Sequence, residues 1–439
     1  MMSHFIDAQL SRTLVLLFWG MGLFLGIHPC DADSSWNPQQ WQFQCQRAEI
    51  APEHWLEEQR SFRGRPTLAL SGNGKVIANG CWTATMTIEP HAPYQFTSFY
   101  STENIAEPNR SVLARILWFD AEGKQVERAE YPRTLLATSP EGWHIIQQRY
   151  KSPDKAVKAQ LELVYRWDGG GMVYFGTTTL EKVAALESRM VRIAAVHHRP
   201  RNSKGVSENL RQFGRFVEQA GEKKADIVCL PEGITVVGTG KSYFEVSEPV
   251  PGPTTQFLGA LAKKLNLYIV AGLYERDGEA VYNTAVLLDR QGRLQGKYRK
   301  VCLPREEIDG GITPGDSFPV FDTDFGRMGM MICWDVFFPE PARMLALHGA
   351  EIIFLPIWGG NINLAKARAI ENQVYLVSST YDMKTGVFDL EGELIVEGTD
   401  DNQIAVVDVD LNAQKLWPWL GDFKNRIPRE MPPRRSLTF

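Results

Sequence analysis

Apolar runs and amphipathic stretches alternate along the second half of the chain. Strand-like apolar runs occupy residues 191–196, 225–230, 267–274, 282–289, 293–303, 351–355 and 375–380. Helix-like stretches, with apolar residues at every third or fourth position, occupy residues 207–222, 257–265, 341–348 and 364–373. The first of these places Leu210, Phe213 and Phe216 on one face. This alternation predicts a layered α/β unit over residues 190–411.

Residues 36–186 carry a different pattern, in which short strand-like runs are separated by turn residues. The runs occupy residues 82–88, 94–100, 112–119, 143–150, 159–165 and 172–179. Between them lie turn sequences such as residues 120–123 (DAEG) and 168–171 (DGGG). Evenly spaced short strands of this kind predict a β-sandwich domain, jelly-roll-like in organisation.

This β pattern is similar to that of galactose-binding-like, carbohydrate-binding modules, and that resemblance makes a glycan the candidate ligand of residues 36–186. Four tryptophans stand at or near strand positions: Trp82, Trp118, Trp143 and Trp167. Each can stack on a sugar ring or pack in the core. Aromatic residues at strand positions of a sandwich more often pack in the core, so the core is the favoured place for them.

The N-terminus has the features of a signal peptide. Residues 13–27 (TLVLLFWGMGLFLGI) form an uncharged apolar run that is short for a bilayer span. Arg12 precedes the run, and Cys30-Asp31-Ala32 follows it with small residues where signal peptidase cleaves. We therefore expect residues 1–32 to be a signal peptide and the protein to be exported to a periplasmic or extracellular compartment. The alternative is an uncleaved membrane anchor.

Length, composition and charge narrow the class of protein. A chain of 439 residues suits two domains, and residues 412–439 remain as a C-terminal tail in which Arg429, Arg434 and Arg435 suggest a solvated end. Its hydrophobic content of 44% is ordinary for a globular protein. The formal charge of −5, without a basic stripe, argues against nucleic-acid binding.

The cysteines give no sign of a metal site. Neither a C-x-x-C nor an H-E-x-x-H pattern is present, so we expect no structural zinc. Cys45 and Cys81 both fall in the β region, and in an oxidising compartment they can form one disulfide if their geometry permits it.

Three apolar runs of the second half end at residues that carry chemistry. Residues 329–332 form a strand-like run that ends at Cys333, and a helix is expected to open near Pro339. A thiol at such a strand-to-helix elbow lies next to backbone N–H groups that can bind an oxyanion. Glu232 follows the run at residues 225–230, and Lys300 lies in the run at residues 293–303. A structural role would explain any one of these three residues alone. It does not explain why all three occur together at the ends of apolar runs.

The order and spacing of Glu232, Lys300 and Cys333 resemble the nitrilase, or carbon–nitrogen hydrolase, superfamily. The resemblance covers about residues 191–411. It implies a four-layer α-β-β-α sandwich for this half, an enzyme acting on non-peptide carbon–nitrogen bonds, and assembly as a homodimer. Two short sequences at and after the thiol look like those of the amidase and N-carbamoyl-amine amidohydrolase branches. They are Cys333-Trp334-Asp335 and Phe338-Pro339-Glu340.

Elementary chemistry assigns roles to these residues. Amides resist attack, so their hydrolysis needs a strong nucleophile, a proton carrier and stabilisation of a developing oxyanion. Cys333 is the expected nucleophile, Glu232 the proton carrier and Lys300 the positive charge, with the backbone N–H of Trp334 as a second donor. A covalent thioester would form on Cys333. No cofactor is implied, because these groups suffice.

The resemblance also implies supporting residues. Family members use a second glutamate after the lysine; Glu306 and Glu307 are the candidates, and Glu307 is favoured. Trp358 and Asn361 are expected to contact a small amide or N-carbamoyl substrate. Three alternatives remain: a nitrilase proper, an N-acyltransferase using the same thioester, and a glycan-binding protein whose hydrolase half is accessory or inactive.

Overall fold

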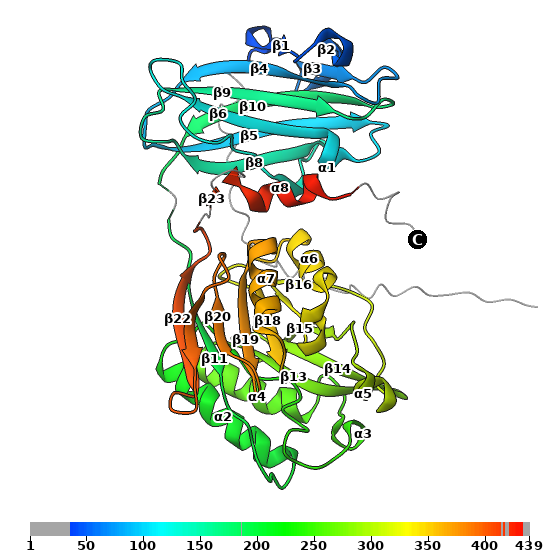
Figure 1. The fold of residues 1–439 in the computed structure, drawn as a ribbon, viewed down its shortest axis with the longest axis vertical. Coiled ribbons are helices and arrows are strands. Elements are labelled where there is room, and N and C mark those ends of the chain that lie inside the picture. Colours follow the sequence, from blue (N-terminus) through cyan, green and yellow to red (C-terminus); the bar gives the residue numbers. More distant parts are fainter. Residues whose placement is uncertain (1–35, 186, 414–415, 418–420, 433–439) are drawn as a thin grey trace, which may run out of the picture.

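The computed structural model describes residues 36–185, 187–413, 416–417 and 421–432. Within these ranges the chain forms an N-terminal β unit and a second unit built of sheets and helices (Figure 1). The expected signal peptide, residues 1–32, lies outside the described residues. No helix of the described part is both long and apolar enough to cross a membrane.

The N-terminal unit consists of two antiparallel sheets. The four-stranded sheet has the order β1 (Gln42–Gln44), β4 (Asn79–Thr87), β9 (Lys158–Arg166), β6 (Val112–Phe119). The six-stranded sheet has the order β2 (Glu53–Phe62), β3 (Arg65–Ser71), β10 (Met172–Lys182), β5 (Pro93–Glu103), β8 (His144–Lys151), β7 (Thr134–Thr138). Three single-turn helices accompany the sheets: η2 (Pro38–Gln40), η3 (Ala48–Ile50) and α1 (Pro108–Ser111). All six strand-like runs predicted from the sequence are strands.

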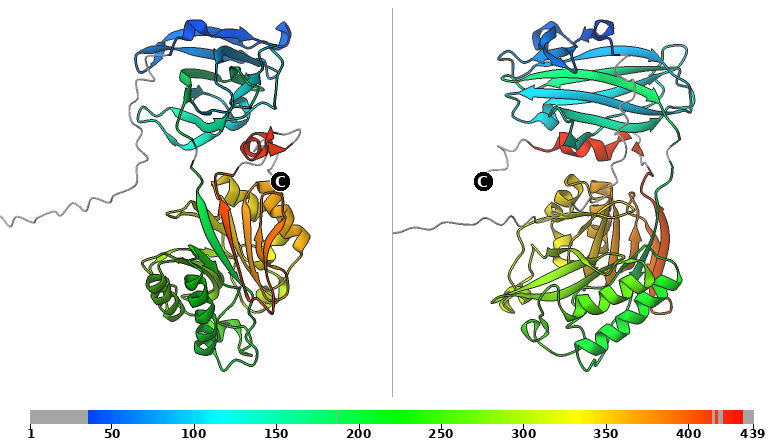
Figure 2. Two further views of the ribbon diagram at one scale, coloured as in Figure 1. Left: turned by 90° about the vertical axis from the view of Figure 1, so that its left-hand side faces the viewer. Right: turned by 180° about the vertical axis from the view of Figure 1, so that it is seen from behind.

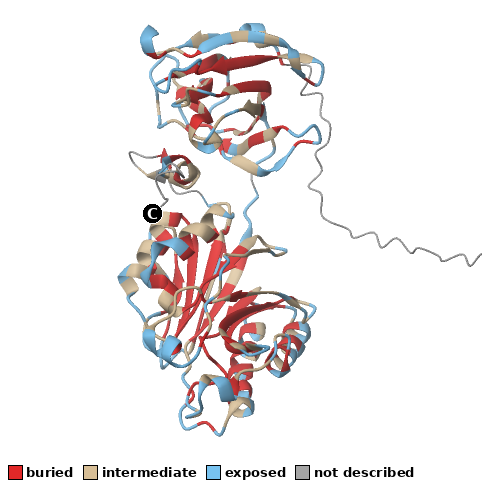
Figure 3. Ribbon diagram, turned by 90° about the vertical axis from the view of Figure 1, so that its right-hand side faces the viewer, coloured by how far each residue is buried: buried red, intermediate tan, exposed pale blue. Residues whose placement is uncertain are grey.

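One hydrophobic core lies between these two sheets. Phe96 and Phe175 from the six-stranded sheet and Ile116 and Leu163 from the four-stranded sheet are fully buried in it. The alternating burial of β5 and β6 shows one face of each sheet turned inward, which is what a period-two apolar pattern produces. Figure 3 shows this buried layer within the unit. These two facing sheets are consistent with the sandwich expected from the sequence.

The four tryptophans for which the core was the favoured place differ in burial, and Trp167 does not lie in the core. Trp82, Trp118 and Trp143 are buried, so a core role explains these three. Trp167 is 45% exposed, and the guanidinium of Arg166 lies 4.0 Å from the centre of its ring. Cys81 is buried and Cys45 partly buried; both are free thiols.

The second unit contains two six-stranded mixed sheets. The first has the order β15 (Leu294–Arg299), β14 (Ala280–Leu288), β13 (Tyr268–Asp277), β12 (Ile227–Cys229), β11 (Met190–Val196), β22 (Ile404–Asp410). The second has the order β16 (Val320–Asp322), β17 (Arg327–Met330), β18 (Ile352–Ile357), β19 (Tyr375–Thr380), β20 (Thr385–Phe388), β21 (Leu394–Gly398). The pairs β11–β12, β12–β13, β17–β18 and β18–β19 are parallel, and the other pairs are antiparallel.

Helices cover the outer face of each of these sheets. On the first sheet pack α2 (Val206–Glu222) and α4 (Pro253–Leu265), and on the second pack α6 (Pro339–Leu347) and α7 (Ile362–Asn372). The two sheets meet face to face, with β11 against β19 and β20, and β12 and β13 against β18. The order of layers is therefore helix, sheet, sheet, helix (Figures 1 and 2). Two short helices, α3 (Tyr243–Val246) and α5 (Arg305–Asp309), lie in loops.

The central strands of this unit are apolar on both faces because other elements cover both faces of each strand. Every residue of β18 and of β12 is buried. One face of β18 packs against the other sheet and the other face against helices, so the run cannot alternate between apolar and polar residues. These runs are therefore readable in the sequence as unbroken apolar segments, and the run of β12 is followed within three residues by Glu232.

The C-terminal segment returns to the N-terminal unit. The short strands β23 (Leu416–Trp417) and β24 (Gly421–Asp422) pair with each other, and helix α8 (Phe423–Glu430) follows. Helix α8 packs on α1, and the carboxylate of Asp422 accepts a hydrogen bond of 3.1 Å from Gln148 Nε2. Arg429 is buried and donates to the carbonyl of Pro132. The prediction of a solvated tail is thus wrong for Arg429, because α8 is covered by the β unit.

Candidate active site

Cys333 stands at a tight turn between β17 and α6. The turn η4 (Cys333–Phe337) opens directly at the thiol, whose backbone has a φ of 41°. A non-glycine residue in this left-handed region is uncommon and is held there by its surroundings. Asp335 provides that support, since its carboxylate accepts bonds of 2.8 Å each from the N–H of Ile332 and the N–H of Cys302. The expected strand-to-helix elbow is present.

Glu232 lies two residues beyond Leu230, just past the end of β12, and is 2% exposed. Its Oε1 accepts hydrogen bonds from Lys300 Nζ at 3.0 Å and from Asn283 Nδ2 at 2.7 Å. Its Oε2 accepts one from the backbone N–H of Trp358 at 2.8 Å. A Cβ at Gly272 would lie 2.7 Å from the Cα of Glu232, so β13 approaches this closely only because it carries glycine there. The carboxylate is fixed in one orientation by three donors.

Lys300 follows β15 and is 1% exposed. Its ammonium lies 2.8 Å from Glu307 Oε2 as well as 3.0 Å from Glu232 Oε1. Burial alone would lower the pKa of Lys300, but the nearby carboxylates of Glu232 and Glu307, with the Cys333 thiol beside them, outweigh it and raise the pKa above its usual range. The side chain is therefore a permanent positive charge at neutral pH.

The second glutamate of the cluster is Glu307. Helix α5 turns Glu307 inward, where it is 3% exposed, and leaves Glu306 exposed to solvent. Burial raises the pKa of Glu307; Lys300 opposes this rise, while the neighbouring Glu232 adds to it. The hydroxyl of Tyr274 donates to Glu307 Oε1 at 3.4 Å. Of the two candidates from the sequence, the structure brings only Glu307 into contact with Lys300 and Glu232.

Asn283 joins the two carboxylates and was not singled out from the sequence. Its amide Nδ2 donates to Oε1 of Glu232 and to Oε1 of Glu307. The residue is fully buried in the middle of β14. The signal for it was a polar residue inside an otherwise apolar strand, Ala280–Leu288, where a buried amide needs partners.

The surroundings of the Cys333 thiol favour its protonated form. Burial raises its pKa well above the usual range, and Glu232 adds to the rise while Lys300 opposes it. Cys333 Sγ lies 3.7 Å from the carbonyl oxygen of Gly359, and Glu232 is close enough to the thiol to raise its pKa. A thiolate is therefore generated only when a neighbouring base accepts its proton, and Glu232 is the carboxylate in position to do so.

The other residues expected to support the site or contact substrate are Trp358, Trp334 and Asn361, and they lie in three different places. Trp358 is at the cluster, since its N–H holds Glu232 and its ring packs edge-on against Tyr381 at 5.0 Å. Trp334 follows the thiol and its ring packs on Phe337 at 4.5 Å. The exposed Asn361 instead caps helix α7, and its side chain accepts the N–H of Asn363. The contact found for the Asn361 side chain is thus with its own helix.

Comparison with known proteins identifies the family. The sequence model of the carbon–nitrogen hydrolase family matches residues 192–418, which is more than half of the chain. The chain belongs to the carbon–nitrogen hydrolase family. It is accordingly an enzyme that hydrolyses carbon–nitrogen bonds, and its resemblance to the nitrilase superfamily is confirmed.

Two relatives represent the curated matches. A nitrilase from Pyrococcus abyssi is 38% identical over 205 residues, covering 43% of this chain and 74% of the relative. The omega-amidase NIT2 of Homo sapiens is 31% identical over 260 residues, covering 53% of this chain and 91% of the relative. Among solved structures, Nit3 of Saccharomyces cerevisiae is 26% identical with a TM-score of 0.46, covering 51% of this chain and 91% of Nit3. These matches concern the second unit.

Proposed function

We propose that this protein is an amide hydrolase that acts through a thioester on Cys333, with Glu232 as the proton carrier and Lys300 as the fixed positive charge. The observation that carries the proposal is the single buried cluster in which Lys300 bridges Glu232 and Glu307 beside the thiol. The substrate is a small non-peptide amide or an N-carbamoyl compound. The omega-amidase relative, 31% identical to this chain, supports this class.

The first half of the reaction forms the thioester. Glu232 accepts the proton of Cys333, and the thiolate attacks the carbonyl carbon of the amide. The negative charge that develops on the substrate oxygen is stabilised by the ammonium of Lys300 and by the backbone N–H of Trp334. Collapse of this tetrahedral intermediate breaks the C–N bond, and Glu232 gives its proton to the leaving amine.

The second half releases the acid and restores the enzyme. Glu232, again ionised, takes a proton from water as the water attacks the thioester carbonyl. The C–S bond then breaks, and the proton returns to the sulfur of Cys333. In both halves the carboxylate alternates between its two protonation states, so the hydrogen bonds that hold Glu232 must tolerate both. Two of the three donors to Glu232, the backbone N–H of Trp358 and the amide of Asn283, are neutral, and the third is the ammonium of Lys300.

The test is turnover of a panel of amides, N-carbamoyl amines and nitriles by the purified protein, with release of ammonia or amine as the readout. Turnover of amides but not nitriles supports the proposal. Turnover of nitriles alone would identify a nitrilase. Faster consumption of amide when hydroxylamine is added, with a hydroxamate as product, would identify acyl transfer from the same thioester.

We also propose that the protein is exported and that it assembles as a homodimer through its hydrolase unit. The apolar run at residues 13–27 and the small residues before position 33 support export. N-terminal sequencing of the protein recovered from an expressing cell tests the cleavage near Ala32, and an intact N-terminus in the membrane fraction would indicate an anchor instead. Light scattering tests the dimer.

A further inference from the structure

Asp335 lies inside the turn that carries the thiol, but no step of the proposed reaction uses it. It is the third residue of η4, two positions after the thiol, and it is fully buried. Its carboxylate accepts three hydrogen bonds of 2.8 Å each. Oδ2 accepts the N–H of Ile332 and the hydroxyl of Tyr298, and Oδ1 accepts the N–H of Cys302. All three donors are electrically neutral.

These donors belong to the two segments that carry the thiol and the lysine of the site. The first donor, Ile332, immediately precedes Cys333 in the sequence. The other two donors stand two positions before and two positions after Lys300. The carboxylate of Asp335 therefore joins the elbow of the nucleophile to the chain on both sides of the lysine.

The two segments must be held in a fixed relation because each supplies a donor to the same oxygen. In the proposed reaction the oxyanion is bound by the N–H of Trp334 and by the ammonium of Lys300. Such donors stabilise an oxyanion when each lies about 2.7–3.1 Å from it. The direction of the Trp334 N–H depends on the backbone of Cys333, whose φ of 41° is uncommon for a residue other than glycine. Lys300 itself contacts Glu232 and Glu307, which belong to neither segment.

The hydrogen bonds of Asp335 require an acceptor at both of its oxygens. Burial raises the pKa of Asp335, while the bonds from its three donors and the charge on Lys300 oppose the rise. An asparagine at this position has nearly the same shape, but its NH2 group can only donate. Whichever way the amide is turned, this group faces the N–H of Cys302 or the N–H of Ile332. Asp335→Asn therefore breaks the link between the two segments while it changes the volume of the side chain little.

We propose that Asp335 is a positioning residue of the reaction, which acts through both Cys333 and Lys300 and holds the Trp334 N–H and the Lys300 ammonium at one oxyanion site. This role rests on the proposed function and adds to it a residue that touches neither the substrate nor the reacting atoms. Loss of one aligned oxyanion donor lowers kcat by about 10²–10³-fold, so Asp335→Asn should lower kcat about a hundredfold. KM should stay within about threefold, because the oxyanion exists only in the transition state.

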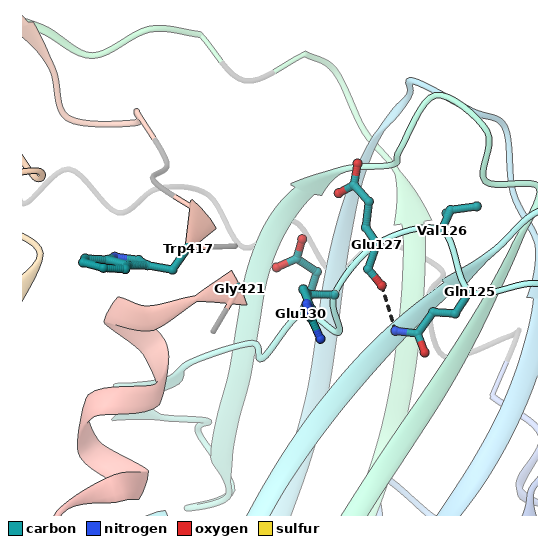
Figure 4. A pocket seen from close by; sticks show the side chains of 7 residues that line it. Gln125, Val126, Glu127, Glu130, Trp417 and Gly421 are labelled. Carbon is teal, nitrogen blue, oxygen red and sulfur yellow. Dashed lines mark hydrogen bonds between the residues drawn. The ribbon is translucent and has the colours of Figure 1, made fainter. Parts of the chain in front are cut away.

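The test measures kcat, KM and the melting temperature of the full-length protein with the amide that it hydrolyses fastest in the substrate panel. Asp289 provides the matched control, because it is a buried aspartate that accepts two backbone N–H bonds and one side-chain bond in the turn between β14 and β15. Asp289→Asn should lower the melting temperature and leave kcat unchanged. Glu130→Gln is a second control, since it changes a buried carboxyl group of the N-terminal unit, in the wall of the cavity shown in Figure 4. It should also leave kcat unchanged.

A transition-state analogue gives a readout that a loss of stability alone would not move. The aldehyde with the carbon skeleton of the best substrate adds to a thiol: the S–C bond forms, the C=O double bond becomes single, and the thiol proton passes through Glu232 to the oxygen. That oxygen then occupies the place of the oxyanion. The inhibition constant of the aldehyde should therefore rise about a hundredfold in Asp335→Asn, in step with the fall in kcat.

Tyr298→Phe decides the matter if Asp335→Asn does not fold. It removes one donor and keeps both backbone bonds of Asp335, so kcat should fall about tenfold at unchanged KM. A parent-like kcat in the folded variant, a rise in KM as large as the fall in kcat, or an equal loss of kcat in Asp289→Asn would each overturn the positioning role alone. Absence of turnover in the parent would instead overturn the proposed function, and this role with it.

Discussion

Asn283 offers the sharpest test of the way the cluster is held together. Its amide donates to Glu232 at 2.7 Å and to Glu307, so Asn283→Ala removes one donor from each carboxylate. A hydrogen bond to a charged group contributes about 1.5–3 kcal/mol. Glu232 keeps its bonds to Lys300 and to the Trp358 N–H, so the carboxylate stays near its place. We assign about 2 kcal/mol of lost transition-state stabilisation to the change, which corresponds to roughly a thirtyfold fall in kcat.

The same substitution should move the pH profile in a defined direction. A donor favours the ionised form of a carboxyl group, and the bond from Asn283 lowers the pKa of Glu307. Its removal raises the pKa of Glu307, so the acid limb of the kcat profile should move to higher pH by about one unit, the equivalent of about 1.4 kcal/mol.

The assay is kcat and KM between pH 5 and 9, with the melting temperature measured on the same samples. Asn209 provides the matched control, because it is a fully buried asparagine whose amide bonds only the backbone carbonyls of Ile234 and Val237. Asn209→Ala should lower the melting temperature and leave the acid limb in place. An unchanged acid limb in Asn283→Ala, or an equal movement in Asn209→Ala, would refute the reasoning.

Three further predictions concern the charges. Lys300→Met should lower kcat by about a thousandfold, because about 4 kcal/mol of oxyanion stabilisation is lost. Steady-state kinetics measures this loss, and an unchanged circular-dichroism spectrum shows that the variant is folded. Glu307→Gln should lower kcat at least tenfold while Glu306→Gln, on the exposed side of α5, should not; equal effects would contradict the assignment. Since the folded-state pKa of Glu130 is raised to about 8 from an ordinary value of 4.5, its stability contribution is present below 4.5 and lost as pH rises through 8. The fall in melting temperature from pH 5 to 8.5 should thus be smaller in Glu130→Gln.

The sequence predicted the central strands and the cluster because both depend on short-range patterns. The strands before Glu232 and Cys333 are made of unbroken apolar runs, so the ends of these runs are visible in the sequence. The family resemblance favoured Glu307 over Glu306 without deciding between them, because the difference depends on the direction in which α5 faces: Glu307 is buried against Lys300 and Glu306 is exposed.

Other features depend on contacts between distant segments and were not predicted. Asn283 is separated from Glu232 by 51 positions, so its role appears only once β14 lies near the end of β12. Strand β2 was not predicted because it is largely exposed and rich in charged residues, without a clear alternation of apolar and polar positions. Arg429 is buried against the β unit, where it donates to the carbonyl of Pro132, 297 positions earlier in the sequence. The roles of Asn283 and Arg429 thus depend on tertiary contacts that local composition does not show.

The most direct test of the central claim is mass spectrometry of the protein during turnover of an amide, with Cys333→Ala run beside it. The account predicts an acyl adduct on the peptide that carries Cys333 in the parent, and loss of both the adduct and ammonia release in Cys333→Ala. The buried Cys229 of the same unit remains as an internal control and should stay unmodified. Turnover that survives in Cys333→Ala, or an adduct on another residue, would contradict the assignment of Cys333 as the nucleophile.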